Sequence, residues 1–534
     1  MAAISCRGLL HCVVLIWSLY IHLRQVDARI LQETFLYQVE VQTAFQATDV
    51  DKNFICATLD WWPSEKCSAN NVCPWGGAGL PYLDLENPKL LEAMKELRPL
   101  VRAGGTLENI VVYDIGGQLP SEPCVNFTVN EGVFYGFSGG CLTMERWDAL
   151  NAFFKKTGVE VVFGLNALYG RNKTKTTTGM GSQNVTGPWN WTNAYELMKY
   201  TRKKNYAISG WELGNELMGL AIDARVNPLQ YSKDLRNLDR IVREVYKGHH
   251  TLPLVIAPDL VYLNISDDLK NFLTDSGREE LDVLTTHSYN LGSGDSASEI
   301  LISNLLNRTF FTKQTDTYKS VNTLLRDHPA IKAWIGESGG VYGSGRHGVS
   351  DTFIDAFWYL DELGTASLFN TKVFCRQSFV GGNYGLLDRS TFEPNPDYYG
   401  ALLWRRLMGE RVLFINVLTL DYISAYAHCQ KDNKGGVTVL LLNFSNTTTA
   451  SFNFNFLGSN KFSFRHEYHM SPADGNITSQ VVLLNGQPLA VTSDGKIPRL
   501  LPVNKAPFEP ISLKPLTYAY IVFPDVHASA CERF

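Results

Sequence analysis

The sequence predicts a (β/α)8 barrel followed by an all-β sandwich domain. Between about residues 54 and 409, short apolar segments alternate with amphipathic ones. After Gly409 the pattern changes to strand-like runs divided by Gly, Asn and Pro. The length of 534 residues is too great for one ordinary domain, and 45% hydrophobic residues suffice for a large core.

Residues 1–28 are predicted to be a cleaved signal peptide. Arg7 precedes an apolar run from about Leu9, and Val26 and Ala28 occupy the −3 and −1 positions of a cleavage site after Ala28. A membrane anchor is the alternative, but the run is short for one, and no later window reaches about 18 apolar residues. We therefore expect secretion without a stable membrane anchor.

Sequons and cysteines agree with secretion. Eight of the ten cysteines follow the signal segment and can form disulfides in an oxidising compartment. Cys67 with Cys73, and Cys124 with Cys141, are plausible pairs by proximity, although sequence alone does not fix connectivity. Zinc ligation is the weaker interpretation, because no CxxC occurs. Asn-x-Ser/Thr glycosylation sequons begin at Asn126, Asn172, Asn184, Asn190, Asn264, Asn307, Asn443, Asn446 and Asn476.

The extended segment 29–53 precedes the barrel, and we expect it to pair with the β-domain at 410–534. Within the barrel region 54–409, the candidate strands are rich in Val, Ile and Leu, which suits strands buried on both faces of a parallel sheet. These candidates are 54–60, 100–105, 159–167, 207–216, 253–259, 281–289, 332–337 and 371–377.

Amphipathic helices separate the candidate strands. Residues 143–158 and 232–247 repeat apolar side chains with a period of 3.6, and 349–364 and 396–409 follow the seventh and eighth strands. Eight strand–helix units predict a (β/α)8 barrel. A doubly wound open sheet is the alternative, but the first strand is not followed by a Gly-rich phosphate-binding turn.

Two glutamates mark the expected active site. Glu216 ends the fourth strand and Glu337 ends the seventh, and barrel active sites form at the C-terminal ends of strands. A lone Glu at such a place is more often a solvated strand end. Two of them, one preceded by Asn215, form a stronger signal, because facing carboxylates are what glycoside hydrolysis requires.

The expected chemistry assigns Glu216 as acid/base and Glu337 as nucleophile, and a separation of about 5–5.5 Å would give retention. Asn215 would hold the sugar 2-hydroxyl and Tyr289 would orient the nucleophile. No metal or organic cofactor is implied, because the two carboxylates and a water complete the reaction. The net charge of −5 argues against nucleic acid as a partner.

At these residues the chain resembles glycoside hydrolase family 79, specifically its plant heparanase-like proteins and plant β-glucuronidases. The resemblance spans nearly all of the mature chain. It implies a barrel with an appended β-sandwich, retaining cleavage of β-linked glucuronic acid, and the same roles for Glu216 and Glu337. Motifs that carry it include "CATLDWWP" (56–63), "WELGNEL" (211–217), "THSYNLG" (286–292), "AWIGESGG" (333–340) and "GGNYGLL" (381–387).

The resemblance also implies a sugar-binding subsite. Gly382 and Tyr384 would bind the glucuronate carboxylate through a backbone N–H and a phenol hydroxyl, although a simple tight turn is the alternative for this loop. Tyr342 and Gly343 would continue the rim. The subsite itself would consist of Asp60, Thr106, Asn215, Tyr289 and Gln377.

We therefore expect a secreted, glycosylated exo-β-glucuronidase acting on glycoprotein glycans or small glucuronides. An endo-acting heparanase-like enzyme is the alternative. A catalytically silent carbohydrate-binding glycoprotein is a third hypothesis, which the two retained glutamates disfavour. The expected destination is the cell wall, with the vacuole or lysosome as alternatives, and the sequence does not indicate an oligomeric state.

Overall fold

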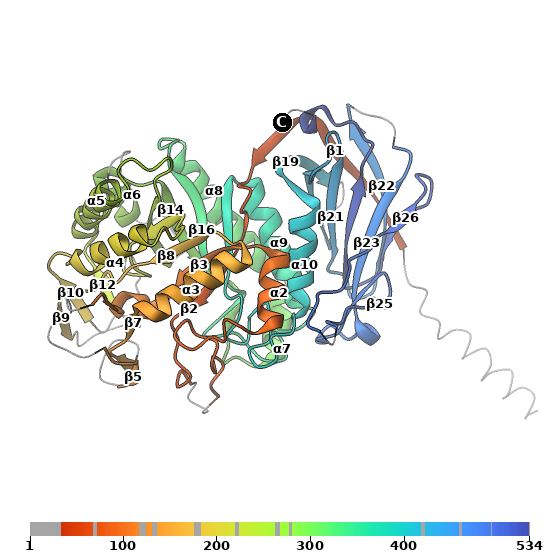
Figure 1. Ribbon diagram of the computed structural model, residues 1–534. Helices are drawn as coiled ribbons and strands as arrows, with labels where there is room; N and C mark the ends of the chain where they lie inside the picture. The colour runs from red at the N-terminus through yellow and green to blue at the C-terminus, as the bar shows by residue number, and fades with distance from the viewer. Residues whose placement is uncertain are drawn as a thin grey trace, which may run out of the picture.

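The computed structural model describes most of the chain, which forms two bodies side by side (Figure 1). The expected signal peptide, Asn264 and the side chain of Asn184 lie outside the described residues. The described residues are 34–67, 72–116, 124–130, 136–175, 183–218, 224–261, 267–276, 280–417, 422–458, 462–492 and 494–532.

The first body is a closed barrel of parallel strands that follow one another in chain order, with the last pairing back onto the first. This closure confirms the predicted barrel and excludes the doubly wound sheet. A disulfide between Cys56 and Cys375 joins the first and last strands at directly paired positions. The strands are β2 (Ile55–Asp60), β3 (Leu100–Gly104), β8 (Val161–Gly164), β11 (Gly210–Glu212), β13 (Leu254–Val261), β14 (Val283–Ser288), β16 (Lys332–Ser338) and β18 (Thr371–Arg376).

Helices surround the barrel. Asn87 and Asn227 cap two of them. Each asparagine directly precedes a proline, and its side chain accepts from two backbone amides of the first turn. Among the described residues, no helix is both long and apolar enough to span a bilayer. The helices are α2 (Pro88–Leu97), α3 (Met144–Thr157), α4 (Thr192–Lys203), α5 (Pro228–Val245), α6 (Asp267–Ser276), α7 (Ser298–Leu306), α8 (Arg308–Leu325), α9 (Asp355–Leu368) and α10 (Pro396–Leu407).

Several short elements lie in the loops that connect the barrel strands and helices. The parallel pair of β4 with β7 lies within the long connection after β3, whereas the parallel pair of β15 with β17 joins the loops that follow β14 and β16. The short elements are η1 (Thr106–Ile110), β4 (Val112–Asp114), β5 (Thr128–Val129), β6 (Phe137–Ser138), β7 (Cys141–Thr143), β9 (Asn172–Lys175), β10 (Gln183–Thr186), β12 (Ala224–Val226), β15 (Gly292–Ser293) and β17 (Val341–Tyr342).

The second body is one hydrogen-bonded sheet. Strand β1 lies inside it, antiparallel to β19 and parallel to β22, so the N-terminal segment pairs with strands from the C-terminal region. Its strands are β1 (Thr34–Asp49), β19 (Met408–Val417), β20 (Ile423–Gln430), β21 (Val437–Asn443), β22 (Thr449–Leu457), β23 (Arg465–Pro472), β24 (Val482–Leu484), β25 (Gln487–Pro488), β26 (Val503–Lys505), β27 (Ile511–Leu513) and β28 (Thr517–Phe523), with 3-10 turns η3 (Ala473–Gly475) and η4 (Ser529–Cys531).

The sheet packs directly on the barrel. Strand β21 is buried on both faces: Val439 and Leu441 join the core of the sheet, while Leu440 and Leu442 join the core shared with the barrel. Helices α9 and α10 lie at this junction (Figure 1), where the Tyr520 hydroxyl of β28 donates to a backbone carbonyl of α10 at 3.0 Å. Because α9 lies between the barrel and the sheet, it is buried along nearly its whole length.

The disulfide pairs expected by proximity, Cys67–Cys73 and Cys124–Cys141, are both present, and a further bond joins Cys429 to Cys531. The expected glycan at Asn443 is contradicted. That side chain is 1% exposed, and its Nδ2 donates to three backbone carbonyls, so the nitrogen has no room for a sugar. The sequons with an exposed or partly exposed asparagine are Asn126, Asn172, Asn190, Asn307, Asn446 and Asn476.

Candidate active site

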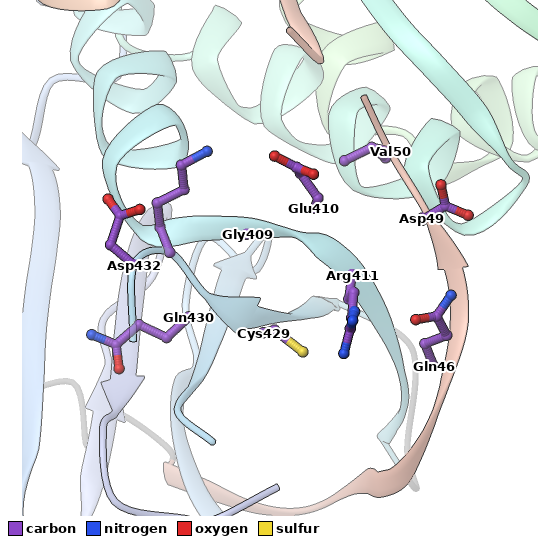
Figure 2. A pocket seen from close by; sticks show the side chains of 10 residues that line it. Gln46, Asp49, Val50, Gly409, Glu410, Arg411, Cys429, Gln430 and Asp432 are labelled. Carbon is purple, nitrogen blue, oxygen red and sulfur yellow. The ribbon is translucent and has the colours of Figure 1, made fainter. Parts of the chain in front are cut away.

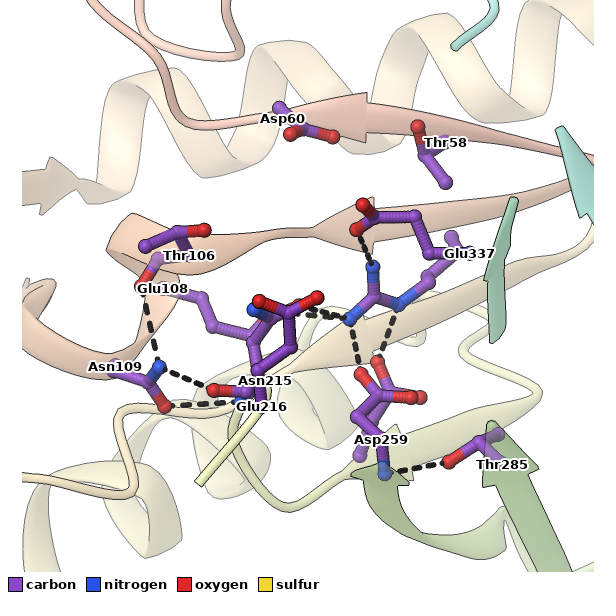
Figure 3. Close-up of polar contacts among 12 residues, drawn as sticks. Thr58, Asp60, Thr106, Glu108, Asn109, Asn215, Glu216, Asp259, Thr285 and Glu337 are labelled. Atoms are coloured by element: carbon purple, nitrogen blue, oxygen red, sulfur yellow. Dashed lines mark hydrogen bonds and ion pairs between the residues drawn. The ribbon is translucent and has the colours of Figure 1, made fainter. Parts of the chain in front are cut away.

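The two glutamates singled out by sequence meet at the C-terminal mouth of the barrel. Glu216 lies in the loop four residues beyond the end of β11, which is shorter than the predicted strand, and Glu337 lies near the end of β16. One carboxylate oxygen of each, together with one ring nitrogen of His287, lie within 4.8 Å of one another. Both glutamates are buried, at 6% and 7% exposed, and Figure 3 shows them on facing sides of a polar cluster.

Arg102 is the centre of this cluster. It lies on β3, is 1% exposed, and its Nη1 donates to Glu337 Oε2 at 3.0 Å. Its Nη2 donates to Asn215 Oδ1 at 2.8 Å and to Asp259, and its Nε donates to Glu212 Oε2 at 2.6 Å. A planar guanidinium with several fixed donors suits this arrangement. Arg102 therefore links the fourth and seventh strands below the two glutamates.

The loop after β11 is shaped to present Glu216. The Asn109 side chain accepts from the Asn215 N–H at 3.0 Å and donates to the Asn215 carbonyl at 2.8 Å. Glu216 has φ 56°, a left-handed conformation that is unusual outside glycine and is found at functional sites. Gly214 is also left-handed, and a Cβ there would lie 2.5 Å from that of Ala167. The backbone thus fixes the direction of the glutamate.

His287, on β14, connects Glu216 to Asp259. Its Nδ1 lies 2.8 Å from Glu216 Oε1, and its Nε2 lies 3.1 Å from Asp259 Oδ1. Burial would lower the pKa of His287, but Asp259 and Glu337 outweigh it and raise that pKa well above its usual value. Burial raises the pKa of Glu216 more than His287 lowers it. The direction of this shift favours the protonated form that a general acid needs.

Glu337 is held through both of its oxygens. The Tyr289 hydroxyl donates to Oε1, while Arg102 donates to Oε2. Burial and the neighbouring Glu337 raise the pKa of Tyr289 well above its usual value, so the phenol remains a donor. Donors on both oxygens fix the orientation of the carboxylate.

Gln377, just after β18, organises the opposite side of the mouth. Its Nε2 donates to Asp60 Oδ2 at 2.9 Å and to the Tyr384 hydroxyl at 3.4 Å, and its Oε1 accepts from Thr58. Burial and the nearby Glu337 raise the pKa of Asp60 to about 7.

The loop that carries Tyr384 is more than a tight turn. Gly382 has φ 69°, and a Cβ there would lie 2.5 Å from the Tyr384 ring. The indole of Trp75 packs edge-on against that ring at 6.3 Å and donates to Ser344 Oγ at 3.0 Å. Three loops are thereby joined around the phenol. Tyr342, expected on the rim, is 50% exposed.

The structure thus gathers all the predicted site residues at one end of the barrel. Gly343, like Tyr342, is exposed there, and Thr106 begins η1 beside Asn109 (Figure 3). Sequence reasoning missed Arg102, Asp259 and His287. For Arg102 and Asp259 the available signal was a charged side chain in a strand of mostly apolar residues, whereas His287 stands between a threonine and a serine and offered only its place at the end of a strand.

Two groups of described side chains are close enough to share a metal ion. One contains Cys124 and Cys141, which form a disulfide and so offer no thiolate. The other is Glu216, His287 and Glu337, whose oxygens and ring nitrogens are engaged by the contacts above. These contacts suit proton transfer and nucleophilic attack better than metal ligation.

A surface pocket of about 420 Å³ lies elsewhere, where β1, β19 and β20 meet (Figure 2). Asp49, Glu410 and Asp432 line it beside Arg411 and Lys431. It contains none of the predicted site residues, so it is separate from the glutamate pair.

Residues 36–364 match the model described as glycosyl hydrolase family 79, N-terminal domain. Heparanase-like protein 2 of Arabidopsis thaliana is 43% identical over 515 residues, which cover 91% of this chain and 93% of the relative. Baicalin-beta-D-glucuronidase of Scutellaria baicalensis is 40% identical over 519 residues, covering 94% of each chain.

Solved structures share the fold at much lower identity. A 4-O-alpha-L-rhamnosyl-beta-D-glucuronidase from Fusarium oxysporum gives a TM-score of 0.62 at 15% identity, over 91% of this chain and all of that one. A GH51 arabinofuranosidase from Xanthomonas axonopodis pv. citri gives 0.59 at 13%, over 91% and 99%. With the family model spanning more than half of its length, the chain belongs to glycosyl hydrolase family 79 and is a glycoside hydrolase.

Proposed function

We propose that this chain is a retaining exo-β-glucuronidase. The observation that carries the proposal is the approach of Glu216 and Glu337, whose nearest functional atoms lie within 4.8 Å. Retaining enzymes place their carboxyl groups about 5–5.5 Å apart, whereas inverting enzymes need about 6.5–9.5 Å to admit a water. The names of the relatives from Scutellaria baicalensis and Arabidopsis thaliana support a glucuronide as the substrate.

In the first step, a carboxylate oxygen of Glu337 attacks the anomeric carbon. The bond from that carbon to the aglycone oxygen breaks, and the proton of Glu216 passes to the departing oxygen. Arg102 and Tyr289 hold Glu337 in orientation, while burial raises the pKa of Glu216, as suits a proton donor. Asn215, held by Arg102 and Asn109, is positioned to contact the 2-hydroxyl.

In the second step, a water oxygen attacks the anomeric carbon and the ester bond to Glu337 breaks. Glu216, now a carboxylate, takes a proton from that water and returns to its acid form. Both glutamates end as they began, and the anomeric configuration is inverted twice, which gives retention.

The side of the mouth that carries Gln377 would recognise the sugar. The Tyr384 hydroxyl and the backbone of the Gly382 loop are neutral donors suited to the glucuronate carboxylate. Asp60 and Gln377 would bind ring hydroxyls, with Thr106 at the edge. Asp60, Glu216, Glu337 and Tyr384 are each at most 7% exposed, and this enclosure supports removal of one terminal sugar over cleavage within a chain.

Four disulfides and several exposed sequons among the described residues support entry into the secretory pathway. N-terminal sequencing of protein recovered outside the cell should start at residue 29. Recovery with residues 1–28 attached would contradict the cleavage.

Hydrolysis of p-nitrophenyl β-glucuronide beside the matching β-glucoside tests the proposed function. We expect release from the glucuronide alone, with the β-anomer of glucuronic acid formed first in NMR-monitored reactions. A β-linked glucuronic-acid-containing polymer should lose only terminal residues. First formation of the α-anomer would contradict retention, internal cuts would favour the endo alternative, and binding without turnover would favour a carbohydrate-binding role.

A further inference from the structure

Neither step of the proposed reaction uses Asp259 or His287. Both are buried, with His287 against Glu216 and Asp259 against His287. Asp259 is rigidly held. Its N–H donates to Thr285 Oγ1 at 2.9 Å, and its Oδ2 accepts from Arg102. A Cβ on Gly336 of β16 would lie 2.6 Å from Asp259 Oδ1, so a glycine at this position leaves room for the carboxylate.

The contacts form one continuous chain between the two glutamates. It runs from Glu216 to His287 at 2.8 Å, from His287 to Asp259 at 3.1 Å, and then through Arg102 to Glu337 at 3.0 Å. Asp259 is the shared member, because one of its oxygens faces the imidazole and the other faces the guanidinium.

We infer that Asp259 and His287 form a positioning pair that stabilises the ionised form of Glu216 while the glycosyl-enzyme exists. The inference rests on the proposed function. It makes the second step, in which Glu216 must accept a proton from water, depend on this pair more than the first.

The movement of charge during the reaction explains why. In the first step Glu337 becomes a neutral ester, and Glu216, having lost its proton, becomes a carboxylate. The negative charge thus leaves the Arg102 end of the chain of contacts and arrives beside His287. An imidazolium held by Asp259 places an N–H donor and a positive charge at the new carboxylate.

The surrounding charges agree with this role. Asp259 and Glu337 raise the pKa of His287 against the effect of its burial, and His287 lowers the pKa of Glu216. The titratable groups that act on Glu216 and His287 are Asp259 on β13, Glu337 on β16 and Tyr289 just after β14, while Arg102 on β3 and Glu212 on β11 act on Asp259.

His287→Gln tests the inference, because glutamine keeps hydrogen-bonding groups and removes the charge. Without the charge, the pKa of Glu216 should rise in both enzyme forms. We expect the alkaline limb of kcat/KM to move up by about one pH unit. With p-nitrophenyl β-glucuronide, whose good leaving group makes the second step limiting, the acid limb of kcat should move up by a similar amount. At pH 5, kcat should fall about tenfold and KM should fall with it.

His428→Gln is the matched control. His428 is also fully buried, but it lies on β20 against the carbonyl of Gly409 at 2.7 Å. This variant should leave both pH limbs in place even if the melting temperature falls. Asp259→Asn, which removes the charge that sustains the imidazolium, should move both limbs in the same direction as His287→Gln.

The wild-type protein supplies an independent measurement. With 15N-labelled histidine and a trapped 2-fluoroglucuronyl-enzyme, both ring nitrogens of His287 should carry protons at pH 7. A neutral imidazole in the trapped enzyme, or variants that lose rate with both limbs unmoved, would overturn the inference. A wild-type enzyme that cleaves no glucuronide would instead overturn the proposed function.

Discussion

Two buried arginines on barrel strands have different kinds of partner. Arg102 of β3 faces the mouth and binds Glu337, Asn215 and Asp259. Arg376 of β18 is equally buried, but it binds Asp355 of α9 and Asp397 of α10, at 2.9 Å for the latter.

The chemistry of the partners separates the two clusters. Arg376 also stacks on Trp358 and Tyr359, at 5.0 and 5.4 Å from the ring centroids, so its cluster joins helices to the barrel wall. The partners of Arg102 include both a proposed nucleophile and the asparagine before the proposed acid. A buried arginine is therefore structural or functional according to which groups its donors orient. Substitutions at Arg102 should change catalysis, and those at Arg376 should change stability.

The largest effect is expected inside the Arg102 cluster. Glu337→Gln removes the attacking carboxylate and should lower kcat by about 10⁴-fold or more. Because the amide oxygen can still accept from Arg102 while its NH2 group donates to the Tyr289 hydroxyl, the melting temperature should stay close to that of the wild type. Steady-state kinetics with p-nitrophenyl β-glucuronide check this, and retention of more than a few per cent of activity would remove Glu337 from its role.

Glu216→Gln should lower turnover by about 10²–10⁴-fold for alkyl glucuronides, whose leaving groups need a proton. The first step with activated aryl glucuronides should suffer much less, which pre-steady-state bursts can measure. Equal losses for both substrate classes would contradict the acid assignment.

Paired lysine substitutions test the comparison itself. Arg102→Lys keeps the charge but loses the fork of donors, and kcat should fall about 10²-fold. Arg376→Lys should leave kcat of the folded protein within about twofold, and should lower the free energy of unfolding by about 3 kcal/mol. Urea unfolding and kinetics on the same samples provide both readings. A large loss of kcat in the Arg376 variant would show that the clusters are not separate.

Tyr289→Phe removes one of the two donors to Glu337 and should lower kcat/KM about tenfold, as expected for one hydrogen bond to a charged group. Steady-state kinetics with p-nitrophenyl β-glucuronide check this, and an unchanged kcat/KM would mean that Arg102 alone orients the nucleophile.

Buried carboxyl groups in both clusters should make the free energy of unfolding fall as the pH rises. Burial is the first cause of a pKa raised to about 7 for Asp60 and Asp355 and to about 8 for Glu212. A carboxyl whose pKa is raised in the folded state binds more protons there than when unfolded. Its stabilising effect is complete below the unfolded pKa near 4 and is lost as pH rises through 7–8. Melting temperatures should therefore be higher at pH 5 than at pH 8, and the reverse order would contradict these shifts.

Sequence alone predicted the barrel, its eight strands and the two glutamates, because each depends on local patterns: apolar runs, their period, and a carboxylate at a strand end. It did not predict the chain of contacts through Arg102, Asp259 and His287. Their proximity arises only when β3, β13 and β14 close into the barrel, and the local patterns that predict the barrel do not show which side chains then meet.

The error at Asn443 has a similar origin. The sequon is a local signal, but the side chain satisfies carbonyls near residues 448 and 513, and only the folded sheet brings these together. A local pattern thus shows that a residue could be modified, whereas its burial and hydrogen bonds in the folded protein determine whether it is accessible.

Trapping the reaction on the enzyme tests the central claim most directly. Incubation with 2-deoxy-2-fluoro-β-glucuronyl fluoride, proteolysis and mass spectrometry should show one added 2-fluoroglucuronyl group, attached to Glu337. The same label absent from Glu337 but found on another carboxylate, or no covalent adduct in an enzyme that cleaves glucuronides, would contradict the account.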